Sequence, residues 1–143
     1  MRILWTRLSL AALLCLATIL SEVEAKEYKA RISHYCPCRQ CCSWHYDSKG
    51  IARFNSNNRE KIIGQTACGS MAREGLTLAM PKEFPFGTHV YTEDGKLFGV
   101  VEDRGGKIYT ESDNTIRIDV YMDDHQKASI AGVKWIIVRT VEP

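Results

Sequence analysis

Six short segments after position 28 have the residue types of β-strands, and in the first of them apolar and polar residues alternate, which is the pattern of a half-buried strand. In the first segment, Ala30, Ile32 and His34 alternate with the other residues of the strand. The predicted strands are Lys29–Tyr35, Leu76–Met80, Thr88–Thr92, Leu97–Glu102, Thr115–Tyr121 and Lys134–Val141, and the last five are rich in β-branched or aromatic residues. The sequence Glu-Asp-Gly at positions 93–95 predicts a hairpin turn between two of them.

One short helix is expected near the C-terminus. Residues Gln126–Ala131 include good helix formers, Asp123 or Asp124 can cap the first turn, and Gly132 suits the left-handed residue after the last turn. A long polar stretch, Pro37–Ile63, indicates a Cys-rich loop. About six short strands, one short helix and no regular alternation of strands with helices favour a mainly β fold, a small β-barrel with crossing connections.

The first 25 residues have the pattern of a secretory signal peptide. Arg2 and Arg7 precede an apolar run from Leu8 to Leu20, and the sequence Val-Glu-Ala before Lys26 offers small residues at a cleavage site. The run of 13 residues is short for a membrane-spanning helix, which needs about 20. We therefore expect one mature domain, residues 26–143, that is secreted or retained in the periplasm or cell envelope, without a membrane span after cleavage.

Composition fits a single folded domain with one site. The 143 residues are 45% hydrophobic and 25% charged, which is ordinary for a globular protein. Nineteen basic and seventeen acidic residues give a net charge of +2 without a basic run. Because a nucleic-acid-binding protein needs a strong positive field, nucleic acid is not expected as a partner.

Five cysteines follow the predicted cleavage site: Cys36, Cys38, Cys41 and Cys42 in the cluster CPCRQCC, and Cys68 further on. Export favours disulfides, and the close spacing within the cluster limits which pairs can reach disulfide geometry. A bridge from the cluster to Cys68 is therefore predicted, with at least one thiol left over. Four thiolates could also hold zinc, but the usual structural site takes two ligands from each of two separated segments. We expect disulfide rather than metal, and no cofactor.

Two aspartates lie where an active site could form. Asp103 ends an apolar strand in the sequence Glu-Asp-Arg-Gly-Gly, and its two glycines allow a ligand to approach closely. In the second strand, Arg117, Asp119 and Tyr121 share one face, which could line a sugar-binding groove. Cleavage of a glycosidic bond needs a carboxyl group that protonates the leaving oxygen. The strand pattern alone favours a plainer interpretation, in which Asp103 starts a turn and Asp119 pairs with Arg117 in solvent.

Four successive motifs resemble the 3D (Asp-Asp-Asp) domain of secreted bacterial cell-wall proteins. They are GQTACGSMAREGLTLAM, FPFGTHVY, GVVEDRGGKI and IRIDVYMDDHQKASIAGVKWIIV, and the upstream YCPCRQCC is similar to the Cys-rich segment of many members. The similarity covers residues 31–141, and the pairing of EDxGGxI with IDVY also resembles the barrel of membrane-bound lytic transglycosylase A. The resemblance implies a double-psi β-barrel and cleavage of the peptidoglycan glycan strand.

The resemblance also implies roles for individual residues. Asp103 matches the aspartate of the DxGG motif and Asp119 that of IDVY, which raises both above the plainer interpretation. We expect a lytic transglycosylase that cleaves between N-acetylmuramic acid and N-acetylglucosamine, with Asp119 as acid/base and Asp103 as its partner, or with the two roles exchanged. Peptidoglycan is then the partner and 1,6-anhydro ends are the product. The predicted substrate-binding residues are Thr66, Gly105, Gly106, Arg117 and Tyr121.

The chain departs from the family pattern at the first of the three aspartates. The corresponding segment, Leu78–Gly87, lacks that aspartate and is one residue shorter. Glu83 could be a displaced substitute, although a lone glutamate before such a strand is more often simply solvated. Two other functions therefore stay open: an expansin-like module that binds glycan without cutting it, and a glycoside hydrolase that uses two carboxylates and water. His45 and His125 could bind metal or act as bases, but neither has a partner at helical spacing, so both are expected to be surface residues.

Overall fold

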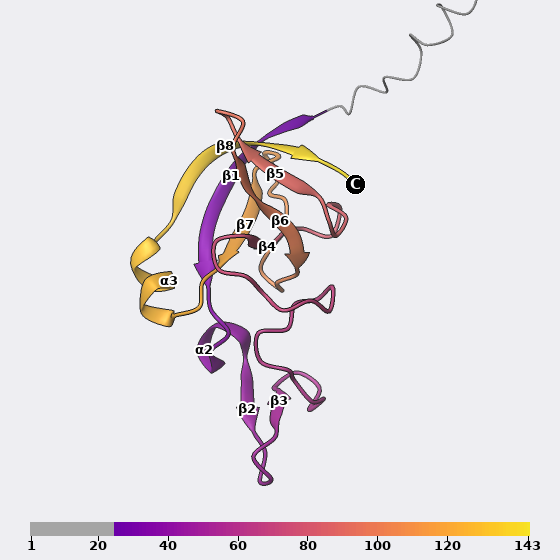
Figure 1. Ribbon diagram of the computed structural model, residues 1–143, viewed down its shortest axis with the longest axis vertical. Coiled ribbons are helices and arrows are strands. Elements are labelled where there is room, and N and C mark those ends of the chain that lie inside the picture. Colours follow the sequence, from indigo (N-terminus) through magenta and orange to yellow (C-terminus); the bar gives the residue numbers. More distant parts are fainter. Residues whose placement is uncertain (1–24) are drawn as a thin grey trace, which may run out of the picture.

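Six β-strands drawn from the whole described chain pair edge to edge in a closed barrel (Figure 1). The computed structural model describes residues 25–143, so the predicted signal peptide lies outside the described residues except for Ala25. The strands are β1 (Lys26–Tyr35), β4 (Thr77–Ala79), β5 (His89–Thr92), β6 (Leu97–Asp103), β7 (Ile116–Tyr121) and β8 (Lys134–Val141), in the order β1-β7-β4-β6-β5-β8. The predicted mainly β class is confirmed, and each predicted strand overlaps one of these six.

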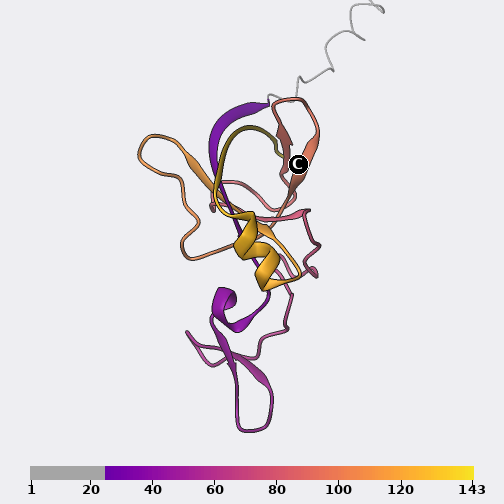
Figure 2. The same ribbon diagram turned by 90° about the vertical axis from the view of Figure 1, so that its left-hand side faces the viewer.

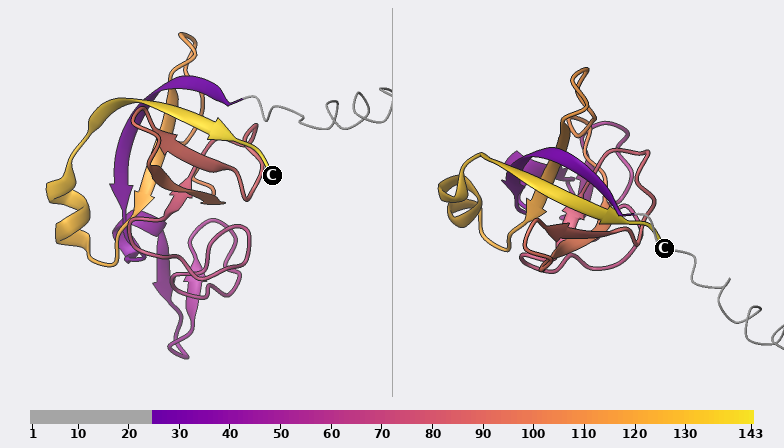
Figure 3. Two further views of the ribbon diagram at one scale, coloured as in Figure 1. Left: turned by 45° about the horizontal axis from the view of Figure 1, so that its top comes forward. Right: turned by 90° about the horizontal axis from the view of Figure 1, so that it is seen from above.

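The barrel combines two kinds of strand pairing. β1 with β7 and β4 with β6 are parallel, and the other four neighbouring pairs are antiparallel. The predicted hairpin joins β5 to β6, with Gly95 at φ 80° in its turn. A parallel pair cannot be joined by a hairpin, so each needs a longer connection that crosses an end of the barrel. Figure 3 shows the barrel from two further directions.

Alternate side chains of the strands fill the barrel. On β7, Ile116, Ile118 and Val120 are buried, whereas Arg117 and Asp119 between them are half-buried. The same pattern gives the fully buried Leu78, Met80, Val90, Val101 and Val138 of the neighbouring strands and connections. Each such apolar side chain contributes about 1.5–3 kcal/mol when it leaves water. The interior therefore stabilises the fold, and the charged residues of β7 are left outside it, whereas Thr77 of β4 and Thr140 of β8 are buried.

A small projection extends from one end of the barrel, in a region where the sequence predicts only a loop (Figures 1 and 2). It contains α2 (Arg39–Cys42), β2 (Trp44–Tyr46) and β3 (Ala52–Phe54), with β2 and β3 paired as a hairpin. The carboxylate of Asp47 closes the turn, because it accepts hydrogen bonds from the N–H groups of Lys49 and Ile51 at 2.9 Å. Elements of three or four residues are too short to show a repeating pattern, which explains why sequence reasoning missed them.

Helix α3 (His125–Ala131) lies outside the barrel, beside the end of β1 (Figures 2 and 3). The carboxylate of Asp124 caps the helix by accepting a hydrogen bond from the Lys127 N–H at 3.0 Å, and Gly132 ends it with φ 64°. Both features were predicted from the sequence, and the helix begins one residue earlier than expected. Within the described chain, no helix is long and apolar enough to cross a membrane.

Candidate functional site

The two predicted aspartates lie on either side of one short strand. Ala79, the last residue of β4, is paired with Asp103 of β6 on one side and with Asp119 of β7 on the other. Neighbouring strands are about 4.8 Å apart, so the Cα atoms of the two aspartates are separated by roughly 10 Å across β4. Sheet pairing therefore brings together two residues from separate sequence motifs.

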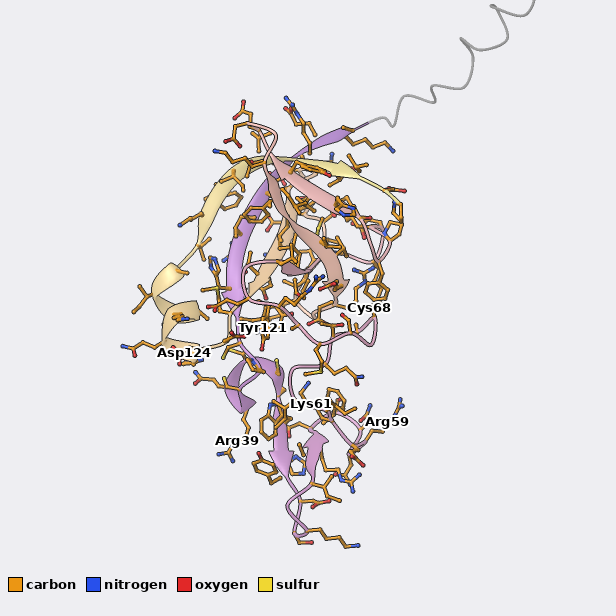
Figure 4. The ribbon with its side chains drawn as sticks, viewed as in Figure 1. Arg39, Arg59, Lys61, Cys68, Tyr121 and Asp124 are labelled. Carbon is orange, nitrogen blue, oxygen red and sulfur yellow. The ribbon has the colours of Figure 1, made fainter. Side chains whose placement is uncertain are left out.

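Both aspartates line a cleft between the barrel and the projection, with a volume of about 570 Å³. The barrel contributes Tyr35 and Tyr121, and the projection and the segment after it contribute Phe54 and Lys61. Figure 4 shows Tyr121 at the lower end of the barrel and Lys61 in the segment below it. The lining combines aromatic surface with charged groups, which suits a ligand that has both apolar faces and polar substituents.

Three hydrogen-bond donors hold the carboxylate of Asp103. The Tyr35 hydroxyl donates to Oδ2 at 2.5 Å, and the N–H groups of Ala67 and Arg104 donate to Oδ1 at 2.9 and 2.8 Å. Burial, followed by the nearby charge of Asp103, raises the pKa of the Tyr35 hydroxyl well above its usual value, so this hydroxyl keeps its proton and remains a donor. Asp103 is therefore fixed in orientation, with both oxygens engaged.

Asp119 has a different environment. The hydroxyl of Ser33, its register partner on β1, donates a short hydrogen bond to Oδ1. No residue of the described chain forms a hydrogen bond or an ion pair with Oδ2, although Asp119 lines the cleft. Asp119 consequently has one oxygen on which a proton can be carried and from which it can be passed to a ligand.

Sequence reasoning missed Ser33 and Tyr35 as site residues. Both lie on β1, and the parallel pairing of β1 with β7 sets Ser33 opposite Asp119 and Tyr35 opposite Tyr121. The rings of Tyr35 and Tyr121 meet edge to face at 5.5 Å between centroids. Their polar positions in an alternating strand were visible in the sequence, but nothing local indicated which strand they would face.

Arg117 lies outside the cleft, in contrast to the predicted substrate-binding role. Its guanidinium forms an ion pair with Glu111 at 2.8 Å and lies over the Tyr109 ring at 4.1 Å. Arg117 precedes Asp119 by two residues on the same face of β7, which places it about 7 Å from Asp119, nearer the start of the strand. The long loop between β6 and β7 supplies both of its partners, so Arg117 anchors that loop.

The other predicted substrate-binding residues, Thr66, Gly105, Gly106 and Tyr121, all line the cleft. Thr66 is buried and its hydroxyl donates to the backbone oxygen of Ser70 at 3.0 Å, so it fixes a turn and forms no hydrogen bond with either aspartate. Gly106 leaves open space where a side chain would stand, since an added Cβ would meet no atom within 4 Å. This backbone segment is therefore accessible to a ligand.

Glu83, the displaced substitute for the missing family aspartate, does not reach the cleft. It is exposed and accepts a hydrogen bond from the hydroxyl of Thr110 in the loop between β6 and β7. The neighbouring acid Glu102 is also occupied, by the Thr77 hydroxyl and the Arg73 guanidinium, both at 2.5 Å. Among the described residues, Asp103 and Asp119 are thus the two aspartates of the cleft.

The predicted bridge between Cys68 and the cysteine cluster is absent, since all five described cysteines are free thiols. Cys68 Sγ lies 3.3 Å from the Thr66 hydroxyl and 3.2 Å from the Ser70 hydroxyl, in a turn whose N–H at Cys68 donates to the backbone oxygen of Glu102. Cys42 lines the cleft, and burial raises the pKa of its thiol to about 11. The Cys68 thiol thus contacts the hydroxyls of Thr66 and Ser70 in its own turn rather than a thiol of the cysteine cluster.

The remaining three cysteines gather around a histidine. The Sγ atoms of Cys36, Cys38 and Cys41 lie 3.5–3.6 Å from Nδ1 of His125, and these side chains could hold a metal ion. His45 is an exposed residue that contacts Asn55, as expected of a surface histidine. The spacing of the cysteines gives no sign of His125, because the fold brings that residue from 84 positions beyond Cys41. The prediction of a disulfide from the cluster to Cys68 is wrong, because the three thiols are free and meet the imidazole of His125 instead.

Three carboxylates of the described residues line the cleft, Asp103, Asp119 and Glu60, and the two aspartates differ in how many donors they accept from. Asp103 has three donors from the described chain, and Asp119 has one. Such asymmetry separates the roles of two carboxylates, because a group that delivers a proton needs an unoccupied oxygen. Comparison with protein-family models and with curated protein sequences finds no match to this chain.

Proposed function

We propose that this chain is a peptidoglycan lytic transglycosylase on a double-psi β-barrel, which cleaves the β-1,4 bond from N-acetylmuramic acid to N-acetylglucosamine. The observation that carries the proposal is the unequal hydrogen bonding of Asp103 and Asp119 on one cleft. The closed barrel of six strands with two parallel pairs supports the proposed double-psi topology. The resemblance of the motifs to the 3D domain supports peptidoglycan as the proposed substrate. The predicted signal peptide is in keeping with a substrate outside the cytoplasm.

In the proposed reaction, Asp119 acts first as acid and then as base. Its carboxylic acid protonates the bridging oxygen, the bond from that oxygen to C1 of the muramic sugar breaks, and positive charge develops at C1. The Asp119 carboxylate then takes the proton of the C6 hydroxyl, and O6 bonds to C1 to close the 1,6-anhydro ring. Asp119 ends protonated, as it began, so no water is consumed.

Asp103 acts as a fixed partner on the other side of Ala79. Its three donors hold it in one orientation, and its carboxylate offers negative charge to the positively charged sugar. A hydrolase would need a second carboxylate to activate water. Because both oxygens of Asp103 already accept hydrogen bonds, we favour the route that needs a single acid/base, and Glu60, which also lines the cleft, is the remaining candidate base for hydrolysis.

The cleft has groups suited to a glycan that carries carboxylates. Aromatic edges and faces from Tyr35, Tyr121 and Phe54 offer apolar contact to sugar rings. Lys61 and Arg104 line the same space and supply positive charge for the lactyl or peptide carboxylates of peptidoglycan. Arg104 is held in place by hydrogen bonds from its guanidinium to the backbone oxygens of residues 80 and 84.

Digestion of purified sacculi by the purified protein, with mass analysis of the released muropeptides, tests this function. We expect 1,6-anhydro-muropeptides, which are lighter by one water than the products of a muramidase. Asp119→Asn should reduce their release at least 100-fold, because the amide cannot donate or accept the transferred proton. Asp94→Asn is the matched control, since Asp94 is exposed in the β5–β6 turn and pairs with Lys96 at the opposite end of β6.

Other outcomes would contradict the proposal in distinct ways. Products with ordinary reducing ends would show hydrolysis, and wild-type activity in Asp119→Asn together with an inactive Asp103→Asn would exchange the two roles. A glycan-binding module without activity is the second candidate function, and the failure of Glu83 to reach the cleft favours it. Co-sedimentation with sacculi but no soluble product would support that candidate.

A further inference from the structure

Four potential metal ligands from three parts of the fold converge beside the cleft. Cys36 follows β1, Cys38 and Cys41 belong to the turn of α2, and His125 is the first residue of α3. Their donor atoms all lie within 4.8 Å of one another. Figure 4 labels Arg39 and Asp124, the sequence neighbours of two of these residues, on the same side of the molecule.

Four of the six distances between these atoms match a tetrahedral zinc site. With Zn–S bonds of about 2.3 Å and a Zn–N bond of about 2.05 Å, tetrahedral angles place two sulfurs about 3.8 Å apart and a sulfur and a nitrogen about 3.6 Å apart. The Sγ atoms of Cys36 and Cys41 are 3.7 Å apart, and Nδ1 of His125 is 3.6, 3.5 and 3.5 Å from the three sulfurs. A disulfide would instead bring two sulfurs to about 2.05 Å.

The local backbone is arranged to present the two thiols of α2 together. The Cys41 N–H donates to Sγ of Cys38 at 3.4 Å, and the Cys42 N–H donates to the Cys38 carbonyl at 3.0 Å. Amide donors to sulfur favour a metal-bound thiolate over a thiol. Ser43 then leaves the turn with φ 48°, and the indole N–H of Trp44 donates to the Pro37 carbonyl at 2.9 Å. The turn is thus fixed on both sides of the ligands.

We propose that Cys36, Cys38, Cys41 and His125 bind one Zn²⁺ ion in a structural site that is independent of the proposed enzymatic activity. Three thiolates and one imidazole are a preferred zinc ligand set, and all four positions are filled by protein, so no position is left for a substrate. The three thiol protons pass to solvent when the metal binds. Cys42 and Cys68 lie outside the set, which accounts for the odd number of cysteines in the described chain.

The zinc ion would tie the projection to the barrel. Its ligands connect the end of β1, the turn of α2 and the start of α3, which are otherwise separate elements. Tyr35, the donor to Asp103, directly precedes Cys36, and Cys42 and Phe54 of the projection line the cleft. Removing the metal should therefore loosen one wall of the cleft while the barrel core, which lies away from the ligands, stays folded.

Elemental analysis of the purified full chain after dialysis gives the first test. We expect one zinc per chain in the wild type, and less than a tenth of that in Cys38→Ser and His125→Ala. Cys68→Ser and His45→Ala are the matched controls and should keep the full zinc content, because their side chains lie in other contacts. Equal zinc content in His125→Ala and His45→Ala would overturn the proposed ligand set.

Measurements on the wild type keep the test decisive if the variants do not fold. X-ray absorption should give three sulfurs at about 2.3 Å and one nitrogen at about 2.05 Å. Replacing zinc by Co²⁺ should produce the intense visible bands of a tetrahedral thiolate site, and one equivalent of Zn²⁺ should remove them. A metal-free protein with Cys36, Cys38 or Cys41 in disulfides, or a site with fewer than three sulfurs, would refute the proposal. Zinc content and coordination are measured without peptidoglycan, and muropeptide release is measured on the wild type as purified, so each proposal can fail while the other stands.

Discussion

Tyr35→Phe tests the hydrogen bond on which the geometry of the cleft depends. The substitution removes only the hydroxyl that donates to Asp103 Oδ2 at 2.5 Å, and it keeps the ring that packs on Tyr121. A hydrogen bond to a charged group contributes about 1.5–3 kcal/mol to stability, and its loss leaves a half-buried carboxylate oxygen without that donor. The free energy of unfolding should fall by about this amount, which corresponds to a decrease in Tm of roughly 5–15 °C for a domain of this size.

A double-mutant cycle with Asp103→Ala isolates the interaction from the other effects of each substitution, because alanine leaves no oxygen to accept the hydrogen bond of the Tyr35 hydroxyl. Urea unfolding of the wild type, the two single variants and the double variant should give a coupling energy of about 1.5–3 kcal/mol between Tyr35 and Asp103. Tyr46→Phe is the matched control, because Tyr46 is 52% exposed and its ring also packs edge to face on a neighbour. Its unfolding free energy should change by less than about 0.5 kcal/mol.

The same variant distinguishes a positioning role from a purely structural one. If Tyr35 holds Asp103 in place for the reaction, Tyr35→Phe should lower kcat for muropeptide release about tenfold and leave KM nearly unchanged. A coupling energy below about 0.5 kcal/mol would refute the assignment of the hydrogen bond. A normal coupling energy with unchanged kcat would show that the bond stabilises the fold without serving the reaction.

Two further predictions concern packing and thiol reactivity. Gly99→Ala should destabilise the barrel by about 1–3 kcal/mol in urea unfolding, because the new methyl carbon would lie 2.5 Å from the Leu76 backbone oxygen. In the control Gly106→Ala, the new methyl carbon meets nothing within 4 Å, so this variant should unfold near the wild-type midpoint. Equal midpoints for the two variants would contradict the packing argument. Burial raises the pKa of the Cys68 thiol, but hydrogen bonds from the neighbouring serine and threonine hydroxyls outweigh it and leave that pKa below its usual value, so the thiolate is already present at a lower pH. Iodoacetamide at pH 8 should therefore modify Cys68 faster than the half-buried Cys42, as followed by peptide mass analysis, and the reverse order would contradict this environment.

The strands and the C-terminal helix were predictable because their signals are local. Alternation in the first strand and β-branched or aromatic residues in the other five identified all six barrel strands. The pair Asp123 and Asp124, of which Asp124 is the cap, and Gly132 marked the ends of α3. The hairpin of the projection was not predictable, since β2 and β3 have three residues each and depend on the turn at Asp47. Short polar segments of this kind resemble loops until tertiary contacts select one conformation.

The residues of the candidate site likewise fall into those that the sequence indicated and those that only the tertiary structure brought together. The sequence by itself pointed to Asp103 and Asp119 through their motifs. It also pointed to the cluster Cys36, Cys38, Cys41 and Cys42, but it predicted a disulfide from that cluster to Cys68, which the structure lacks. The tertiary structure alone decided that Ser33 and Tyr35 act on those aspartates, because that depends on the parallel pairing of β1 with β7.

It also decided that the ion pair of Arg117 goes to Glu111 and that His125 completes the cysteine cluster. Alternation and capping report on neighbours along the chain, whereas strand order and the meeting of distant loops depend on how the whole barrel closes around its core. A ligand that lies 84 positions away can therefore be found only once the fold is known.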